Sequence, residues 1–216
     1  MKVQLVKLIT IFTIMLFGCG QEKKEQPVTL KSEKSINLKV QEELAVISTQ
    51  FGDMVVEFYK RAAPKHVESF KLHVKNGFYD GTIFHRVIPG FMIQGGDPNT
   101  KGEDVMSYGI GGHAAKFYGF GDEKNMNSWK LPAEFNDIKH TKGILSMARS
   151  NDKNSAGSQF FICDGNPSHL DAQYTVFGKV IEGLDIIDKI AGLPRDNRNN
   201  PLKRIDMKIR LKPKNL

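Results

Sequence analysis

A single stretch, residues 84–97, sets one arginine and one glutamine among large apolar side chains. It reads as two short strands joined by a turn at Pro89-Gly90. A plain core strand would not carry Arg86, because burying an unpaired charge costs free energy. An apolar pocket with a few fixed polar groups is the usual makeup of a ligand site. The stretch therefore predicts a binding site built on a strand hairpin.

Strand geometry predicts which side chains of this stretch lie together, since successive residues point to opposite faces. Phe84 and Arg86 should share one face, and so should Met92 and Gln94. His85 should point to the opposite face, where a hydrogen-bonded packing role is favoured over direct catalysis.

Short strand-like segments dominate the remainder of the chain, and only two segments have helical spacing. Val67, Phe70 and Val74 predict a helix that begins at Pro64 and ends at Gly77. Many short strands with two helices favour a mainly antiparallel sandwich or closed barrel over a parallel α/β sheet. The second helix is expected over 184–191, and strands over 45–49, 54–59, 82–87, 91–94, 144–148, 159–163, 174–180 and 205–211.

The net charge of +7 raises the question of a nucleic-acid partner. A nucleic-acid surface usually shows a basic stripe with interleaved aromatic residues, and the sequence has none. A solvated, lysine-rich surface is the favoured interpretation, and no nucleic-acid partner is expected.

The N-terminus has the features of an export signal. Lys2 and Lys7 precede an apolar run over 8–17, which is too short to span a bilayer and fits a secretory signal. The run closes on Leu16-Phe17-Gly18-Cys19, which resembles the bacterial lipobox, where the cysteine carries lipid and becomes the first mature residue. We expect a lipoprotein signal peptide over 1–18. An ordinary signal peptide with an incidental cysteine and an uncleaved anchor are the alternatives.

Residues 19–40 are polar and rich in charge, so they cannot bury enough surface to fold. They read as a flexible tether with its lipid on Cys19, followed by a folded domain over 41–216. The lipobox resemblance implies a lipid-anchored location in the bacterial cell envelope, with the membrane as a partner. Gly20, in place of an aspartate after the cysteine, favours the outer membrane over the inner one.

The other cysteine, Cys163, would then have no disulfide partner. It follows an apolar strand, and no nearby base is suggested, so we expect a packed, inert thiol rather than a nucleophile. His66 and His73 lack partners at ligand spacing and are expected to be surface or packing residues. We expect neither a metal nor a cofactor.

A long, glycine-rich segment over 99–135 has no clear regular structure. Segments of this length are usually functional or mobile, and we expect the 109–135 part of this one to add a lip beside the site. Its Gly109-Ile110-Gly111-Gly112 sequence neither follows a clear strand nor opens a helix, so a phosphate cradle is not favoured.

Three blocks resemble the cyclophilin family, in the family's order: 84–97, 143–162 and 170–180. The likeness extends over roughly residues 41 to 213. It implies a closed eight-stranded antiparallel β-barrel capped by two helices, and peptidyl-prolyl cis/trans isomerase activity.

The resemblance also implies the residues of the site. Arg86 matches the family's catalytic arginine, and Gln94 its neighbouring glutamine. His169 and Tyr174 stand where eukaryotic members carry a tryptophan and a histidine, so cyclosporin sensitivity is in doubt, while the tyrosine ring can still form a pocket wall. The remaining implied contacts are Phe91, Met92, Phe161 and Leu170 around the proline ring, Ala148 and Gln159 along the client backbone, and Ser150 and Asn151 at the border.

Rotation about an X-Pro bond must break amide resonance, a barrier of roughly 18–20 kcal/mol. At the twisted midpoint the proline nitrogen gains a localised lone pair, so a guanidinium that donates to it favours the transition state over the planar ground state. Arg86 suits this role because it stays charged and holds its donors in a rigid plane.

The expected function is thus isomerisation of proline-containing segments in exported or envelope proteins, by a chain expected to be a monomer. A binding module of the same shape, which holds such segments without turning them over, is the alternative. General chaperoning could accompany either function.

Overall fold

The computed structural model describes residues 42–214, and within them it contains eight strands and two α-helices. The expected signal peptide, tether and Cys19 anchor lie outside the described residues, so they stay predictions. Among residues 42–214, no helix combines the length and the apolar character needed to cross a bilayer.

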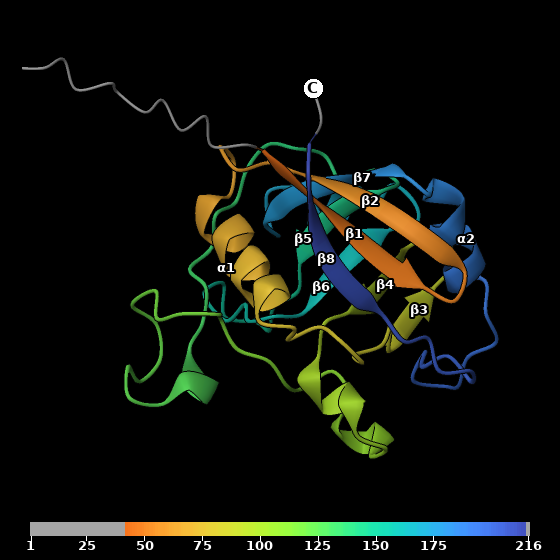
Figure 1. The fold of residues 1–216 in the computed structure, drawn as a ribbon, viewed down its shortest axis with the longest axis horizontal. Helices are drawn as coiled ribbons and strands as arrows, with labels where there is room; N and C mark the ends of the chain where they lie inside the picture. The colour runs from red at the N-terminus through yellow and green to blue at the C-terminus, as the bar shows by residue number, and fades with distance from the viewer. Residues whose placement is uncertain (1–41, 215–216) are drawn as a thin grey trace, which may run out of the picture. The chain divides into compact units, whose positions relative to one another are not determined.

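All eight strands pair antiparallel in one curled sheet, in the order β3-β4-β6-β5-β7-β2-β1-β8 (Figure 1). The mainly antiparallel architecture expected from the sequence is confirmed. The strands are β1 (Glu43–Thr49), β2 (Gly52–Phe58), β3 (Arg86–Ile88), β4 (Met92–Gly95), β5 (Ile144–Met147), β6 (Phe160–Cys163), β7 (Val176–Glu182) and β8 (Lys208–Pro213).

The prediction of a closed barrel is wrong, because the edge strands β3 and β8 do not pair and the sheet is an open half-barrel. Only the segments that precede these strands meet. Ile83 forms an isolated bridge with Asp206, and the Phe84 amide donates to the Ile205 carbonyl at 3.2 Å. β3 has only three residues, so it is too short to extend this bridge into a ladder.

Both expected helices are present, α1 (Pro64–Lys75) and α2 (Leu184–Ala191). α1 packs against β7 and β8, and α2 packs against β2, β3 and β4, at opposite ends of the sheet (Figure 1). Proline at the start of α1 has no amide to satisfy, and Gly77 follows the helix at a φ of 65°, a conformation that glycine adopts without strain.

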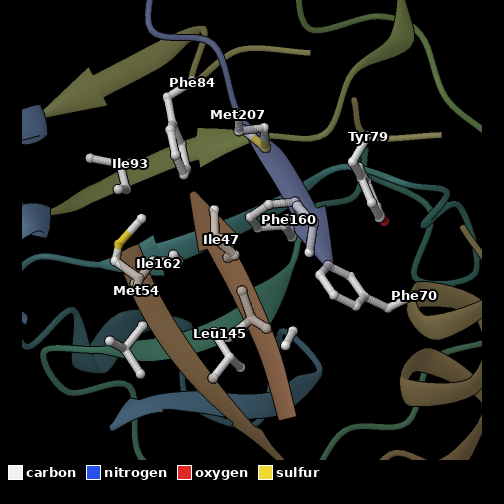
Figure 2. Close-up of a cluster of buried hydrophobic side chains, with 14 of the residues drawn as sticks. Ile47, Met54, Phe70, Tyr79, Phe84, Ile93, Leu145, Phe160, Ile162 and Met207 are labelled. Atoms are coloured by element: carbon white, nitrogen blue, oxygen red, sulfur yellow. The ribbon is translucent and has the colours of Figure 1, made fainter. Parts of the chain in front are cut away.

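Alternate residues of the central strands separate the main core from a second cluster on the other face. Phe160 and Ile162 of β6 enter the main core together with Leu145 of β5 (Figure 2). Phe161 and Cys163 of β6 belong to the second cluster. The candidate functional site lies on that second face, so alternate residues of a strand either pack in the main core or line the site.

A local irregularity before β3 overturns one expectation. Arg86 is the register partner of Gln94, yet the amide of His85 also donates to the Gln94 carbonyl, at 3.0 Å. Two residues thus oppose one, as in a β-bulge, and the alternation of faces is reset. Phe84 consequently lies in the main core beside Ile93 (Figure 2), and it does not share a face with Arg86.

The predictions for two buried side chains, Cys163 and His85, have different outcomes. Cys163 is free and fully buried, and burial raises the pKa of its thiol to about 12, as expected for an inert residue. His85 is also buried, but neither of its ring nitrogens has a hydrogen-bond partner among residues 42–214. It packs as expected, although without the expected hydrogen bond.

Candidate active site

A small hollow of about 120 Å³ opens on the outer face of β3, β4 and β6, next to the end of β5. Of its nine lining residues, eight are among the site residues predicted from the sequence, and the ninth is Arg149. The eight are Arg86, Phe91, Met92, Gln94, Ala148, Phe161, Leu170 and Tyr174. We call this hollow the proline pocket, after the ligand that the sequence predicts for it.

The apolar wall of the proline pocket consists of buried side chains and one aromatic pair packed edge to face. Met92, Phe161 and Leu170 are buried. The ring of Phe161 meets Tyr174 edge-on, with centroids 5.8 Å apart and planes at 82°, an arrangement that aromatic pairs prefer. These contacts fix the orientation of the wall.

His169 does not line the proline pocket. It is exposed and stacks on the half-buried Phe91, with ring centroids 5.8 Å apart. In this structure His169 thus adjoins the proline pocket through Phe91, and its contact with a client stays a prediction.

A directional chain of hydrogen bonds leads away from Arg86. Its Nη1 donates to Oε1 of Gln94 at 3.3 Å, Nε2 of Gln94 donates to Oε1 of Gln159 at 3.0 Å, and Nε2 of Gln159 donates to the Gly111 carbonyl at 2.8 Å. Gln159 thus supports Gln94 from outside the proline pocket. The two glutamines hold the guanidinium by one edge and leave its other donors available.

Arg86 remains a cation at the pocket wall. Partial burial lowers the pKa of Arg86, while Tyr174 acts in the opposite sense. A guanidinium stays protonated in proteins, so its charge persists. Within residues 42–214, no carboxylate forms a salt bridge with it. The guanidinium also lies 5.9 Å from the centroid of Phe91, which places it beside the apolar wall.

Arg149 was missed by the sequence reasoning, although it stands between two predicted residues, Ala148 and Ser150. Its guanidinium lies 4.5 Å from the ring centroid of Tyr174. It also donates to the carbonyls of Gln173, at 3.0 Å, and Ser150, at 2.8 Å. Arg149 therefore braces the tyrosine wall from its outer side.

A buried polar chain lies behind the pocket, and the sequence did not indicate it. Nδ1 of His140 lies 3.1 Å from Oδ1 of Asp171, and Nε2 lies 3.1 Å from Oγ of Ser146. Ser146 is fully buried and donates to the Thr175 carbonyl, so it is not placed as a nucleophile despite the order of the three groups. Asp171 and His140 are 31 positions apart, which no local spacing rule reveals.

A second hollow of about 380 Å³ adjoins the proline pocket and shares Gln94, Ala148 and Arg149 with it. Gln159 and Ser150 line this second hollow, whereas Asn151 lines neither. Part of the 99–135 segment forms its wall, namely residues 109–112 and 130, as expected of a lip.

The glycine-rich part of that wall is held by one buried carboxylate. Asp97 accepts the amides of Gly109 at 2.6 Å and Gly111 at 3.3 Å. Because these amides are already paired, they cannot form a phosphate cradle, in agreement with the sequence interpretation. Among residues 42–214, no three His, Cys, Asp or Glu side chains gather as a group able to hold a metal ion.

Comparison with known families places this site in context. Residues 44–210 match the family described as cyclophilin type peptidyl-prolyl cis-trans isomerase. A peptidyl-prolyl cis-trans isomerase of Acinetobacter baylyi is 43% identical over 153 residues, which is 68% of this chain and 71% of the relative. A probable peptidyl-prolyl cis-trans isomerase of Brucella abortus is 42% identical over 153 residues, 69% of this chain and 71% of the relative.

A solved structure has the same architecture. The cyclophilin type isomerase of Cryptosporidium parvum, crystallised in the presence of the dipeptide Ala-Pro, superposes with a TM-score of 0.66 at 30% identity. The match covers 80% of this chain and 99% of the Cryptosporidium chain.

Proposed function

Because the chain belongs to the cyclophilin-type peptidyl-prolyl cis-trans isomerase family, we propose that it isomerises X-Pro bonds of exported and envelope proteins and so assists their folding. The isomerase activity itself follows from the family. The client class and the folding role rest on the export signal expected over 1–18.

One observation carries the assignment of the site: a guanidinium without a carboxylate partner among the described residues stands at the wall of a small apolar pocket. A proline ring seated against Phe161 and Leu170 would bring the imide nitrogen toward Arg86. A free donor there stabilises the lone pair that forms as the bond twists. The Ala-Pro dipeptide used with the Cryptosporidium relative supports a proline ligand.

The walls contribute to the same step. Holding the ring while the preceding carbonyl rotates reduces the freedom that the reacting bond must lose. Excluding water from the apolar wall strengthens the interaction of the guanidinium with the nitrogen. No bond to the protein forms and no proton needs to be transferred, so Arg86 acts as a fixed electrostatic partner.

An exchange NMR assay on an Ala-Pro peptide tests the role of Arg86. Arg86→Ala should lower kcat/KM by about 10²–10³-fold, the size of effect seen when one fixed transition-state donor is lost. Arg86→Lys should recover only part of this, because a lysine lacks the planar fork. Arg61→Ala, at an exposed position outside the pocket, is the matched control. Wild-type rates for Arg86→Ala would refute the assignment.

The location of the protein is part of the proposal. A lipid on Cys19 would anchor the domain to the envelope membrane, with the outer membrane favoured by Gly20. A lipidated terminus with several acyl chains holds a protein at a bilayer far better than one chain does. Cys19→Ser should move the protein from the membrane fraction to the soluble fraction, while Cys163→Ser should not. A Cys19→Ser variant that stays with the membrane would contradict the anchor.

A further inference from the structure

The second hollow, next to the proline pocket, is cationic. Lys130 and Arg149 line it, and Arg86 stands in the adjoining pocket. Among the residues that the structure describes, no aspartate or glutamate lines either hollow. Within residues 42–214, none of the three cations forms a salt bridge.

This imbalance is not a general property of the basic surface. A larger hollow of about 590 Å³, beside α1, is lined by lysines and glutamates together. There Lys71 pairs with Glu43 at 3.2 Å and Lys214 pairs with Glu57 at 2.5 Å. Three of the five lysines that line that hollow, Lys71, Lys75 and Lys214, pair with glutamates, whereas among residues 42–214 the cations around the client site have no acidic partner.

The position of Arg149 is fixed while its charge remains uncompensated. Its hydrogen-bond partners are the carbonyls of Gln173, Ser150 and Asn151, which are neutral, and its face covers Tyr174. Lys130 is half-buried and has only a long contact, 3.4 Å, from Nζ to the Gly112 carbonyl. The hollow therefore holds one rigid cation and one adjustable cation.

We propose that the second hollow binds an acidic side chain of the client, an aspartate or glutamate within about three residues of the proline. This rests on the proposed function, since the proline must occupy the adjoining pocket. A carboxylate near Lys130 and Arg149 would form charge-assisted hydrogen bonds, which are stronger than neutral ones. The unpaired charges would also steer acidic segments toward the site.

The test uses the full-length chain and peptides that differ at one position, carrying Glu, Gln or Lys at each of the three places before and after the proline. At low salt, kcat/KM from exchange NMR should be about tenfold higher for Glu than for Lys at one or more of these places, with Gln between. The preference should shrink at about 0.5 M salt, because screening weakens exposed charge pairs. Equal values for all three residues at every place would overturn the proposal.

A charge reversal distinguishes the hollow from the overall charge of the protein. Lys130→Glu should invert the preference, so that the Lys peptide becomes the better substrate. Lys124→Glu makes the same change of net charge at an exposed lysine that does not line the hollow, and it should leave the preference unaltered. Identical effects of the two variants would show that the hollow does not select the side chain.

Failure of this proposal and failure of the proposed function give different results. If the Gln peptide is turned over but no charge preference is found, the proposal that the second hollow binds an acidic side chain is wrong, while the proposed isomerase site still stands. Peptide affinities from chemical-shift titration report the charge preference independently of turnover. If the Glu and Lys peptides bind equally at every place, the proposal is wrong whether or not the bond is isomerised.

Discussion

The imidazole of His140 stacks on the ring of Phe161, with ring centroids 6.0 Å apart and planes at 16°. Phe161 is a wall of the proline pocket, while His140 lies behind it and does not line the hollow. The position of the wall thus depends on a buried residue that the client does not touch. Ser146, the register partner of Phe161, completes the support from β5.

Hydrogen-bond chemistry defines the state of His140. The Asp171 carboxylate only accepts, so Nδ1 of His140 must carry a proton. In the neutral ring Nε2 is then an acceptor, and the single hydroxyl hydrogen of Ser146 has two acceptors within reach, Nε2 and the Thr175 carbonyl. Burial lowers the pKa of His140, although the Asp171 carboxylate acts in the opposite direction. The imidazole ring is therefore uncharged at pH 7.

His140→Phe should lower kcat/KM by about tenfold, which corresponds to the ~1.4 kcal/mol expected when buried partners lose a hydrogen bond. The phenyl ring can still stack on Phe161, so the loss would report the polar contacts of the ring with Asp171 and Ser146. Lys139→Gln removes an exposed partner of Asp171, 3.4 Å away, and should change the rate less than twofold. A His140→Phe enzyme with wild-type kinetics would show that stacking alone positions Phe161.

Much of this site follows from period-two alternation along strands. Met92 and Gln94 share the pocket face, as predicted, because β4 is regular there. Phe84 departs from the alternation of faces because the chain forms a bulge at His85. No residue type in the sequence indicates a bulge at that position. Regular strand geometry can be predicted from a sequence, whereas the position of a bulge depends on how the strand pairs with its neighbour.

Long-range polar contacts were the other part that the sequence could not reveal. Asp171 meets His140, and Glu134 meets His66, through pairings set by the curl of the sheet. Sheet closure was also mispredicted, because it depends on whether β3 extends far enough to meet β8. Each of these features requires the relative placement of distant segments, which residue patterns do not encode locally.

Gln94→Glu should reduce kcat by about 10–100-fold, because a carboxylate beside Nη1 of Arg86 would bind its charge in the ground state. Gln94→Ala removes the support without adding a charge, so its loss should be smaller, several-fold. The measurement is kcat by exchange NMR at pH 7. If Gln94→Glu were as active as Gln94→Ala, neutralisation of Arg86 would not matter to catalysis.

Glu134 supplies the N-terminal cap that α1 lacks locally, since Ala63 has no capping side chain. Its carboxylate accepts the amides of Lys65 at 3.1 Å and His66 at 3.0 Å, and it lies 2.7 Å from Nδ1 of His66. Glu134→Gln should lower the free energy of unfolding by about 1–2 kcal/mol, as for loss of a charged cap. The exposed Glu123→Gln on the same segment should have little effect in the same urea titration.

The pH dependence of this cap has a definite sign. Burial opposes ionisation of Glu134, but the hydrogen bonds from His66 and Lys65 outweigh it and lower the pKa. A lowered carboxyl pKa contributes stability that is present above the unfolded value and lost as pH falls through the folded value. The difference in unfolding free energy between wild type and Glu134→Gln should therefore shrink below about pH 4.5. A constant difference down to pH 3 would contradict the cap.

His85 should make the fold sensitive to mild acid. Burial lowers the pKa of His85 to about 4, so the folded chain leaves it neutral while the unfolded chain protonates it near pH 6.5. Between these two pKa values the unfolded state binds more protons than the folded state. The contribution of His85 to the free energy of unfolding is therefore fully present above pH 6.5 and decreases as the pH falls toward 4. The loss between pH 7.5 and 5 should be about 2 kcal/mol from this residue.

His85→Leu removes the titrating group without breaking a ring hydrogen bond, because neither ring nitrogen has a hydrogen-bond partner within the described part of the chain. The variant should therefore lose about 2 kcal/mol less than wild type between pH 7.5 and 5, as measured by urea unfolding. His73, whose pKa burial also lowers to about 4, is present in both proteins and cancels in the comparison. A His85→Leu variant that reproduced the wild-type pH dependence would show that the buried imidazole is protonated in the folded chain.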